Sequence, residues 1–248
     1  MGLEQALTEN EVILVDSSFK GANSSYNGHG GIGEYIFGIN KFRAFDAGII
    51  EKELQAMNEF LDILNLDCVR TTPETTTELQ ELETHISTKH HVLSQSLVRT
   101  PKNPRKKRHI ELDEAGEYNQ EIFGDLHNVI YRIVKASKKY ELQKCDELCI
   151  SQEAIDALKR VVCFISDLAQ IKKPGSVDRD TDEKITASAF YFSMYSDKKP
   201  AVFTSDGDFY GLMSFVPRMM ACRYFMPYNA EFRRAMKRNP PKLYLKEI

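Results

Sequence analysis

The acidic residues of this sequence that could perform chemistry lie beside apolar segments: Asp16, Glu78, Asp182 and Asp206. Asp16 directly follows the apolar residues 12–15, and Asp206 comes shortly after the mainly apolar residues 201–204. Carboxylates on short turns next to buried strands can converge at one edge of a parallel sheet. Oxygen ligands of this kind suit hard cations, so the pattern predicts a site for Mg²⁺ or Mn²⁺ and for phosphate chemistry.

Each of these acids, taken alone, has a simpler interpretation as a helix cap or a solvated turn residue. The four are more informative together, because carboxylates that converge without a cation repel one another and raise each other's pKa. A bound divalent cation removes that conflict. We therefore expect one shared metal site rather than four unrelated turn residues.

The elements that must position the acids follow from apolar periodicity and turn residues. The expected strands are residues 11–15, 68–72, 201–204 and 242–245, the last at a sheet edge. The expected helices are residues 49–64, 73–86, 117–139, 154–168, a helix opening at 180–182, and 210–221, interrupted at Pro217. Thr72 and Ser151 are expected N-caps. Strands that alternate with helices predict an α/β fold with a parallel sheet.

The composition is that of an ordinary globular chain rather than a strongly basic nucleic-acid binder. The 248 residues carry a formal net charge of -3, and the pI is near 6.1. The 5 cysteines include no C-x-x-C pair, which argues against a zinc ribbon or a disulfide framework. The first ten residues lack a signal-peptide pattern, and no apolar run has the length of a membrane span. We therefore expect a cytoplasmic protein with no membrane partner.

Several segments of the sequence resemble motifs of the PIN-domain nucleases. Residues 12–18 are similar to the family's opening strand, where a metal-binding Asp is followed by Ser or Thr. Residues 72–79 resemble the second motif, which ends in Glu-Leu, and residues 182–189 the third, an Asp leading an Ala-rich helix. Residues 203–209 resemble the fourth, Thr-x-Asp followed by another Asp and Phe. The resemblance covers residues 10–86 and 178–248.

The resemblance implies a PIN-like three-layer fold with a central parallel sheet flanked by helices. A single domain of this kind would span residues 1–248. Residues 87–170, which the resemblance does not cover, would form a helical insertion with an exposed, mobile basic loop at 99–108. The apolar stripes of the insertion would pack on the domain, form a homodimer or recruit a protein partner.

The resemblance also implies a reaction, which is metal-dependent hydrolysis of phosphodiester bonds in single-stranded RNA. The ligands of one Mg²⁺ or Mn²⁺ would be Asp16, Asp182, Asp206 and Glu78, the last directly or through water. Glu74 and Glu81 are alternatives to Glu78. The residues that would orient waters or hydrogen-bond to the ligands are Asp180, Asp208, Ser17 and Thr204. For the two hydroxyl residues, ordinary turn capping is the alternative role.

Basic residues would supply the attraction for RNA that an acidic site lacks. The expected contacts are Arg105, Lys106, Lys107, Arg108, Arg233 and Arg234. The alternative for the basic loop is a solvated segment with no role in binding. Residues 28–33 match G-x-G-x-x-G, but polar residues separate them from the first strand. This argues against a phosphate cradle and favours a loop, which could cover the site as a lid.

The sequence thus favours a Mg²⁺- or Mn²⁺-dependent endoribonuclease, and two alternatives stay open. One is a DNA-directed nuclease or a phosphatase that uses the same acids. The other is a catalytically silent PIN-like scaffold that binds RNA or a protein. A panel of RNA, DNA and phosphomonoester substrates separates the first alternative, while the second predicts no hydrolysis even with Mn²⁺.

Overall fold

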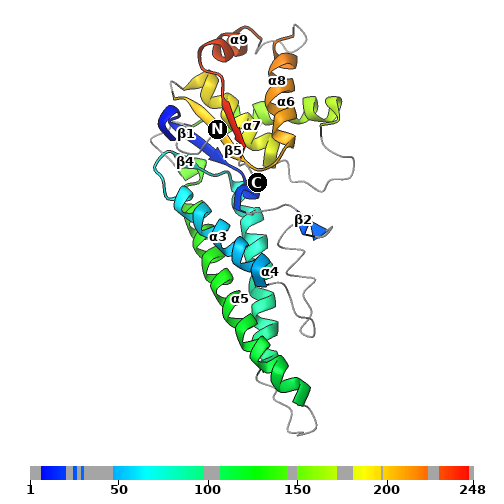
Figure 1. Cartoon of the computed structure of the whole chain (residues 1–248). Coiled ribbons are helices and arrows are strands. Elements are labelled where there is room, and N and C mark those ends of the chain that lie inside the picture. The colour runs from blue at the N-terminus through cyan, green and yellow to red at the C-terminus, as the bar shows by residue number, and fades with distance from the viewer. Residues whose placement is uncertain are drawn as a thin grey trace. The chain divides into compact units, whose positions relative to one another are not determined.

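The computed structural model of the chain divides into two compact units (Figure 1). Unit 1 consists of residues 1–19, 64–76 and 137–248, and unit 2 of residues 20–63 and 77–136. The residues that the structure describes are 7–20, 25–26, 29–30, 47–97, 107–144, 150–171, 181–196, 198–222 and 229–245. Asp16, Asp182 and Asp206 belong to unit 1, whereas Glu78 belongs to unit 2.

Unit 1 contains a 4-stranded, all-parallel sheet in the order β4-β1-β5-β6 (Figure 1). Its strands are β1 (Val12–Val15), β4 (Val69–Arg70), β5 (Pro200–Thr204) and β6 (Lys242–Leu245). Each lies where the sequence predicts a strand, and β6 is at an edge as expected. The predicted α/β class, with a parallel sheet flanked by helices, is therefore confirmed.

The strands β1 and β5 form the middle of the sheet because their residues are almost all apolar. Every residue of both strands is buried, which is typical of parallel strands covered on both faces. Their register pairs Val15 with Phe203, and the Asp16 N–H donates to the Phe203 carbonyl at 3.2 Å. The two strands therefore end at the same level, and the residues after them meet at the carboxyl edge of the sheet.

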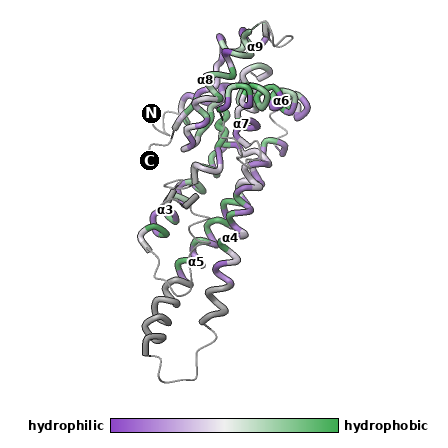
Figure 2. The backbone as a smooth tube through the Cα atoms, turned by 90° about the vertical axis from the view of Figure 1, so that its right-hand side faces the viewer, coloured by the Kyte–Doolittle hydropathy of each residue, from purple (hydrophilic) through white to green (hydrophobic). Residues whose placement is uncertain are grey.

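Unit 1 also contains the helices α6 (Gln152–Ala169), α7 (Thr181–Tyr195), α8 (Asp208–Met220) and α9 (Asn229–Arg238). α7 lies against β1 and β5, and the other three helices pack on α7. Residues 181–193 of α7 are all buried, so this part of the helix has no solvent-facing side. The hydrophobic colouring of α6 and α7 in Figure 2 marks the core that they share.

The two predicted N-caps are present. At the start of α6, the Ser151 Oγ accepts a hydrogen bond from the Ala154 N–H at 3.3 Å. At the start of α4 (Pro73–Leu97), the Thr72 Oγ1 accepts from the Thr75 N–H at 3.2 Å. Each bond satisfies an N–H of the first turn that has no partner within its helix.

The predicted interruption of a helix at Pro217 is wrong, because α8 continues through this residue. Proline removes one backbone hydrogen bond from the helix. The burial of Val216 and Met220 beside it in the core offsets that loss. The Pro217 carbonyl still accepts a hydrogen bond, from the Ala221 N–H at 3.0 Å at the end of the helix.

The predicted start of the helix at residue 117 is also wrong, because α5 spans Lys107–Lys139. Lys107 and Arg108 are therefore helical and do not belong to a loop. The physical reason is visible in the sequence, where residues 107–115 contain neither proline nor glycine and the prolines come before them.

Unit 2 contains most of three helices, α3 (Ala47–Leu64), α4 and α5, and a hairpin of β2 (Ser25–Tyr26) and β3 (His29–Gly30). α4 and α5 lie side by side in Figures 1 and 2. The boundaries of this unit differ from the expected insertion of residues 87–170, because α6 belongs to unit 1. Across the described ranges, no helix is long and apolar enough to cross a membrane.

Candidate functional site at the carboxyl edge of the sheet

Asp16 lies at the carboxyl edge of the sheet, directly after β1, and is only 3% exposed. A carboxylate buried to this extent requires hydrogen-bond donors. Its Oδ1 accepts the Ser17 N–H at 2.7 Å, and its Oδ2 accepts the Ser18 N–H at 3.2 Å. Such bonds to the next residues form an Asx turn, which leads the chain from the strand into the 3-10 helix η1 (Ser17–Lys20).

Two hydroxyl groups from neighbouring strand ends also hold the Asp16 carboxylate. The Thr204 Oγ1, at the end of β5, donates to Oδ2 at 3.1 Å, which is the hydrogen bond that the sequence leads us to expect. The Ser18 Oγ donates to the same oxygen. The Thr204 hydroxyl in turn accepts the Asp206 N–H at 2.9 Å, and the Ser18 hydroxyl accepts the Ser205 N–H at 3.4 Å. The two turns are thus joined through the carboxylate.

Ser18 is a site residue that the sequence analysis missed. The residue expected to support Asp16 from this turn was Ser17, which contributes its backbone N–H. The Asp-x-Ser spacing was the available signal, because an Asx turn brings the hydroxyl two residues later back toward the carboxylate. The Ser205 Oγ adds a further link by donating to the Ser18 carbonyl at 2.9 Å.

Asp206 occupies the turn between β5 and α8 and is half-buried. Its Oδ1 accepts the Asp208 N–H at 2.8 Å, which satisfies a backbone donor at the start of α8. A carboxylate in this place is favoured by the partial positive charge of the helix N-terminus. The expected residue Asp208 thus contributes at least its N–H to holding Asp206 in place.

Asp182 lies in the first turn of α7 and is 6% exposed. α7 packs along β5 and is joined to it by the short connection from Tyr195 to Pro200. The helix must therefore run opposite to the strand, and its first turn lies on the carboxyl side of the sheet. Asp182 thus comes from the same side of unit 1 as Asp16. The neighbouring candidate Asp180 is outside the described residues.

The glutamate candidates divide between the two units. Glu78 and Glu81 lie on the part of α4 that belongs to unit 2. Glu74 lies in the first turn of α4 and belongs to unit 1. Its Oε1 is 3.8 Å from the Lys159 Nζ on α6, so it already has a cationic neighbour within this unit.

The donor chemistry of this edge fits a hard cation in part. Asp16 and Asp206 supply carboxylate oxygens, and Mg²⁺ often uses one or two carboxylates, completed by waters and substrate phosphate. The Asp16 Oδ1 accepts from the Ser17 N–H, whereas its Oδ2 accepts from three donors. Over the described parts of the chain, no three His, Cys, Asp or Glu side chains form a group that could hold a metal ion. The fit therefore rests on two aspartates.

The basic candidates lie elsewhere in the fold. The Arg233 Nε donates to the Ala221 carbonyl at 2.9 Å, and its Nη2 donates to the same oxygen, so this guanidinium binds the end of α8. Arg234 is exposed on α9. Lys107 and Arg108 begin α5 in unit 2. Arg105 and Lys106 are outside the described residues, as are residues 28 and 31–33 of the glycine motif.

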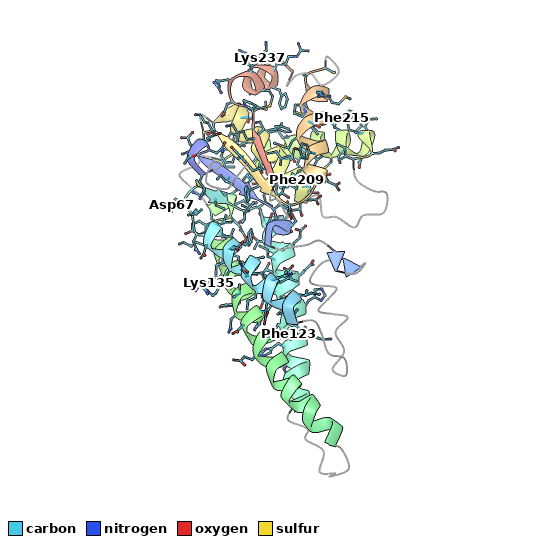
Figure 3. The ribbon with its side chains drawn as sticks, in the orientation of Figure 1. Asp67, Phe123, Lys135, Phe209, Phe215 and Lys237 are labelled. Carbon is cyan, nitrogen blue, oxygen red and sulfur yellow. The ribbon has the colours of Figure 1, made fainter. Side chains whose placement is uncertain are left out.

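The basic end of α9 lies at the amino edge of the sheet, opposite the aspartates. Lys237 and Arg238 lie in its last turn, and Lys237 is labelled in Figure 3. The next residue, Asn239, donates from its side-chain amide to the Lys198 carbonyl at 2.7 Å, just before β5 begins. The length of β5 separates this basic end from the acidic edge, a distance of about 16 Å.

Buried charges behind the edge were also missed by the sequence analysis. Lys184 on α7 is 4% exposed, and its Nζ donates to the Asp156 Oδ1 on α6 at 2.5 Å. This hydrogen bond lowers the pKa of the Asp156 carboxyl below its ordinary value. The adjacent Glu183 accepts a hydrogen bond from the Ser166 Oγ at 3.0 Å, also between these helices. The two pairs fix the first turn of α7, which carries Asp182.

Comparisons with protein-family models, with curated proteins and with solved structures found no match to this chain.

Proposed function

We propose that the chain is a Mg²⁺- or Mn²⁺-dependent endoribonuclease with a PIN-like fold, whose site is the carboxyl edge of the unit 1 sheet. The observation that carries the proposal is the joining of the Asp16 and Asp206 turns through the Thr204 hydroxyl. Two acids on adjacent parallel strands, held in this way, match the position where open α/β sheets bind ligands. The motif resemblance of the sequence adds the reaction class.

The residues of the chain have separate tasks in this proposal. Asp16 and Asp206 would hold the cation, and Asp182 would join them from the first turn of α7. A divalent cation at this edge would neutralise charge on the phosphodiester and ease ionisation of the attacking water. Thr204 and Ser18 hold the Asp16 carboxylate in one orientation before substrate arrives, which lowers the cost of assembling the site.

The position of the basic residues supports a substrate of some length. The acidic edge repels phosphate, whereas the α9 end with Lys237 and Arg238 attracts it from the opposite edge of the sheet. A single-stranded RNA that contacts both edges must span β5. We therefore expect cleavage to fall with rising salt for long RNA and to be weak for dinucleotides.

A silent binding scaffold is the second candidate, and one observation favours it. The Asp16 Oδ2 already accepts from the Ser18 N–H, the Ser18 hydroxyl and the Thr204 hydroxyl. A carboxylate oxygen with three donors has little remaining capacity for a cation. In this candidate the same bonds join the two strand ends, and the chain binds RNA without cutting it.

The deciding experiment measures cleavage of single-stranded RNA, structured RNA, single-stranded DNA and a phosphomonoester with Mn²⁺, with Mg²⁺ and with chelator. The variants are Asp16→Asn and Asp206→Asn, each of which removes one negative charge with little change in shape. Asp62→Asn, the same change at an exposed position of α3, is the matched control.

The proposal predicts metal-dependent RNA cleavage that both variants lose and the control retains. The half-buried Asp206 is the more informative position, because its replacement disturbs packing less than that of Asp16. RNA binding without hydrolysis under every metal condition would instead establish the scaffold, and DNA cleavage alone would reassign the substrate.

A further inference from the structure

Exposed apolar side chains concentrate on two helices of unit 1. Within the described ranges, the large hydrophobic residues that are exposed are Tyr131, Phe164, Leu168, Tyr195, Tyr210 and Phe215. Four of these six lie on α6 and α8, which pack on each other. The contact is close, because a Cβ added at Gly211 on α8 would lie 2.9 Å from the Ile171 Cγ2, just beyond α6.

The outer face of α6 is built around Phe164 and Leu168, which are 58% and 59% exposed. These residues are four positions apart and share one face of the helix with Arg160 and Asp167, which are also exposed. The inner face of the same helix carries Ile155, Leu158, Val162 and Ile165, all buried in the core. The helix is thus held firmly from inside while its outer face exposes two large apolar groups.

The charges on this outer face follow a self-complementary pattern. Arg160 lies about 6 Å before Phe164 along the helix axis, and Asp167 lies about 4.5 Å after it. A cation and an anion thus flank an exposed aromatic ring at nearly equal distances. In the described part of the chain, neither Arg160 nor Asp167 forms an ion pair.

We propose that the outer face of α6, defined by Arg160, Phe164, Asp167 and Leu168, binds the same face of a second copy of this chain. In an antiparallel pairing about a twofold axis near Phe164, Arg160 of each copy lies opposite Asp167 of the other. The two aromatic rings then meet near the axis and are removed from water. A twofold interface requires this kind of self-complementary surface.

The charge pattern selects this occupant over an unrelated partner. A second copy in antiparallel orientation satisfies both charges of the face with one operation, and the same operation covers Phe164 and Leu168. Tyr210 and Phe215 on the neighbouring helix α8 are also exposed. Figure 3 labels Phe215 together with Phe209, which is on the same helix but fully buried.

Sedimentation velocity over a range of micromolar concentrations tests the proposal with the full chain. The intact protein is expected to dimerise, and Phe164→Asp is expected to raise the dissociation constant about tenfold or more. Tyr131→Asp is the matched control, since Tyr131 is 57% exposed but lies on α5, and it should leave the dissociation constant unchanged.

Charge reversal makes the test specific to the antiparallel geometry. Arg160→Glu and Asp167→Arg should each weaken the dimer, because each places like charges opposite one another in both symmetric contacts. The double variant should recover most of the lost affinity, since every opposite pair is restored. A monomer at all concentrations would overturn the proposal, and so would a dimer whose affinity none of the α6 variants changes.

Discussion

Replacing Thr204 by valine removes one hydroxyl from the carboxyl edge of the sheet while keeping the shape of the side chain. Thr204 is fully buried and donates to the Asp16 Oδ2 at 3.1 Å. A hydrogen bond to a charged group contributes about 1.5–3 kcal/mol. We expect Thr204→Val to lower the free energy of unfolding by about 2 kcal/mol. For a chain of this size, that corresponds to a fall in Tm of about 4–8 °C.

A double-mutant cycle assigns this loss to the bond with Asp16. The measurement is the free energy of unfolding of the intact chain, Thr204→Val, Asp16→Ala and the double variant, from urea denaturation followed by circular dichroism. Asp16→Ala removes the acceptor but leaves the bond from the Asp206 N–H to the Thr204 hydroxyl, so Thr204→Val should cost about 1 kcal/mol less in that background than in the intact chain. An equal cost in both backgrounds would refute the reasoning, since the hydroxyl would then act independently of the carboxylate.

Further predictions concern the helices around the site and unit 2. Lys184 holds the pKa of Asp156 below its ordinary value, so this pair stabilises the fold above about pH 4. The stabilisation is lost as the pH falls through the lower pKa of Asp156 in the folded state. Asp156→Asn should therefore make the free energy of unfolding depend less on pH in the acid range, as measured by denaturation curves. Burial, with a smaller contribution from His127, lowers the pKa of His90. The folded state thus binds a proton on His90 less readily than the unfolded state does, so the free energy of unfolding should decrease as the pH is lowered from about 6.5. His90→Gln should make this decrease smaller in the same curves. Ser151→Ala should cost about 1 kcal/mol through loss of the α6 N-cap, measured by thermal unfolding.

The central strands could be predicted because their signal is local. Residues 12–15 are apolar and branched without interruption, which is a pattern that only a strand covered on both faces explains well. Residues that directly follow parallel strands must lie at the carboxyl edge, so the places of Asp16 and Asp206 followed from the strands alone. The N-caps Thr72 and Ser151 were equally local, because a cap acts within its own first turn.

The remaining features depend on contacts between distant segments. The Ser18 hydroxyl matters because β5 brings Thr204 beside it, and that neighbour is 186 residues away in the sequence. The hydrogen bond from Arg233 to the Ala221 carbonyl, at the end of α8, depends on how α9 packs. The assignment of α6 to unit 1 depends on its buried face, which the periodicity identifies without naming its partner. Such facts are set by tertiary packing, which local patterns do not encode.

The central claim is that Asp16 and Asp206 together hold one divalent cation. Its most direct test is titration of the chain with Mn²⁺, with the free ion measured by electron paramagnetic resonance for the intact protein, Asp16→Asn, Asp206→Asn and the Asp62→Asn control. We predict one site per chain that both edge variants weaken by about tenfold or more and that the control leaves unchanged. Equal Mn²⁺ binding by all four proteins, or no binding by any, would contradict the claim.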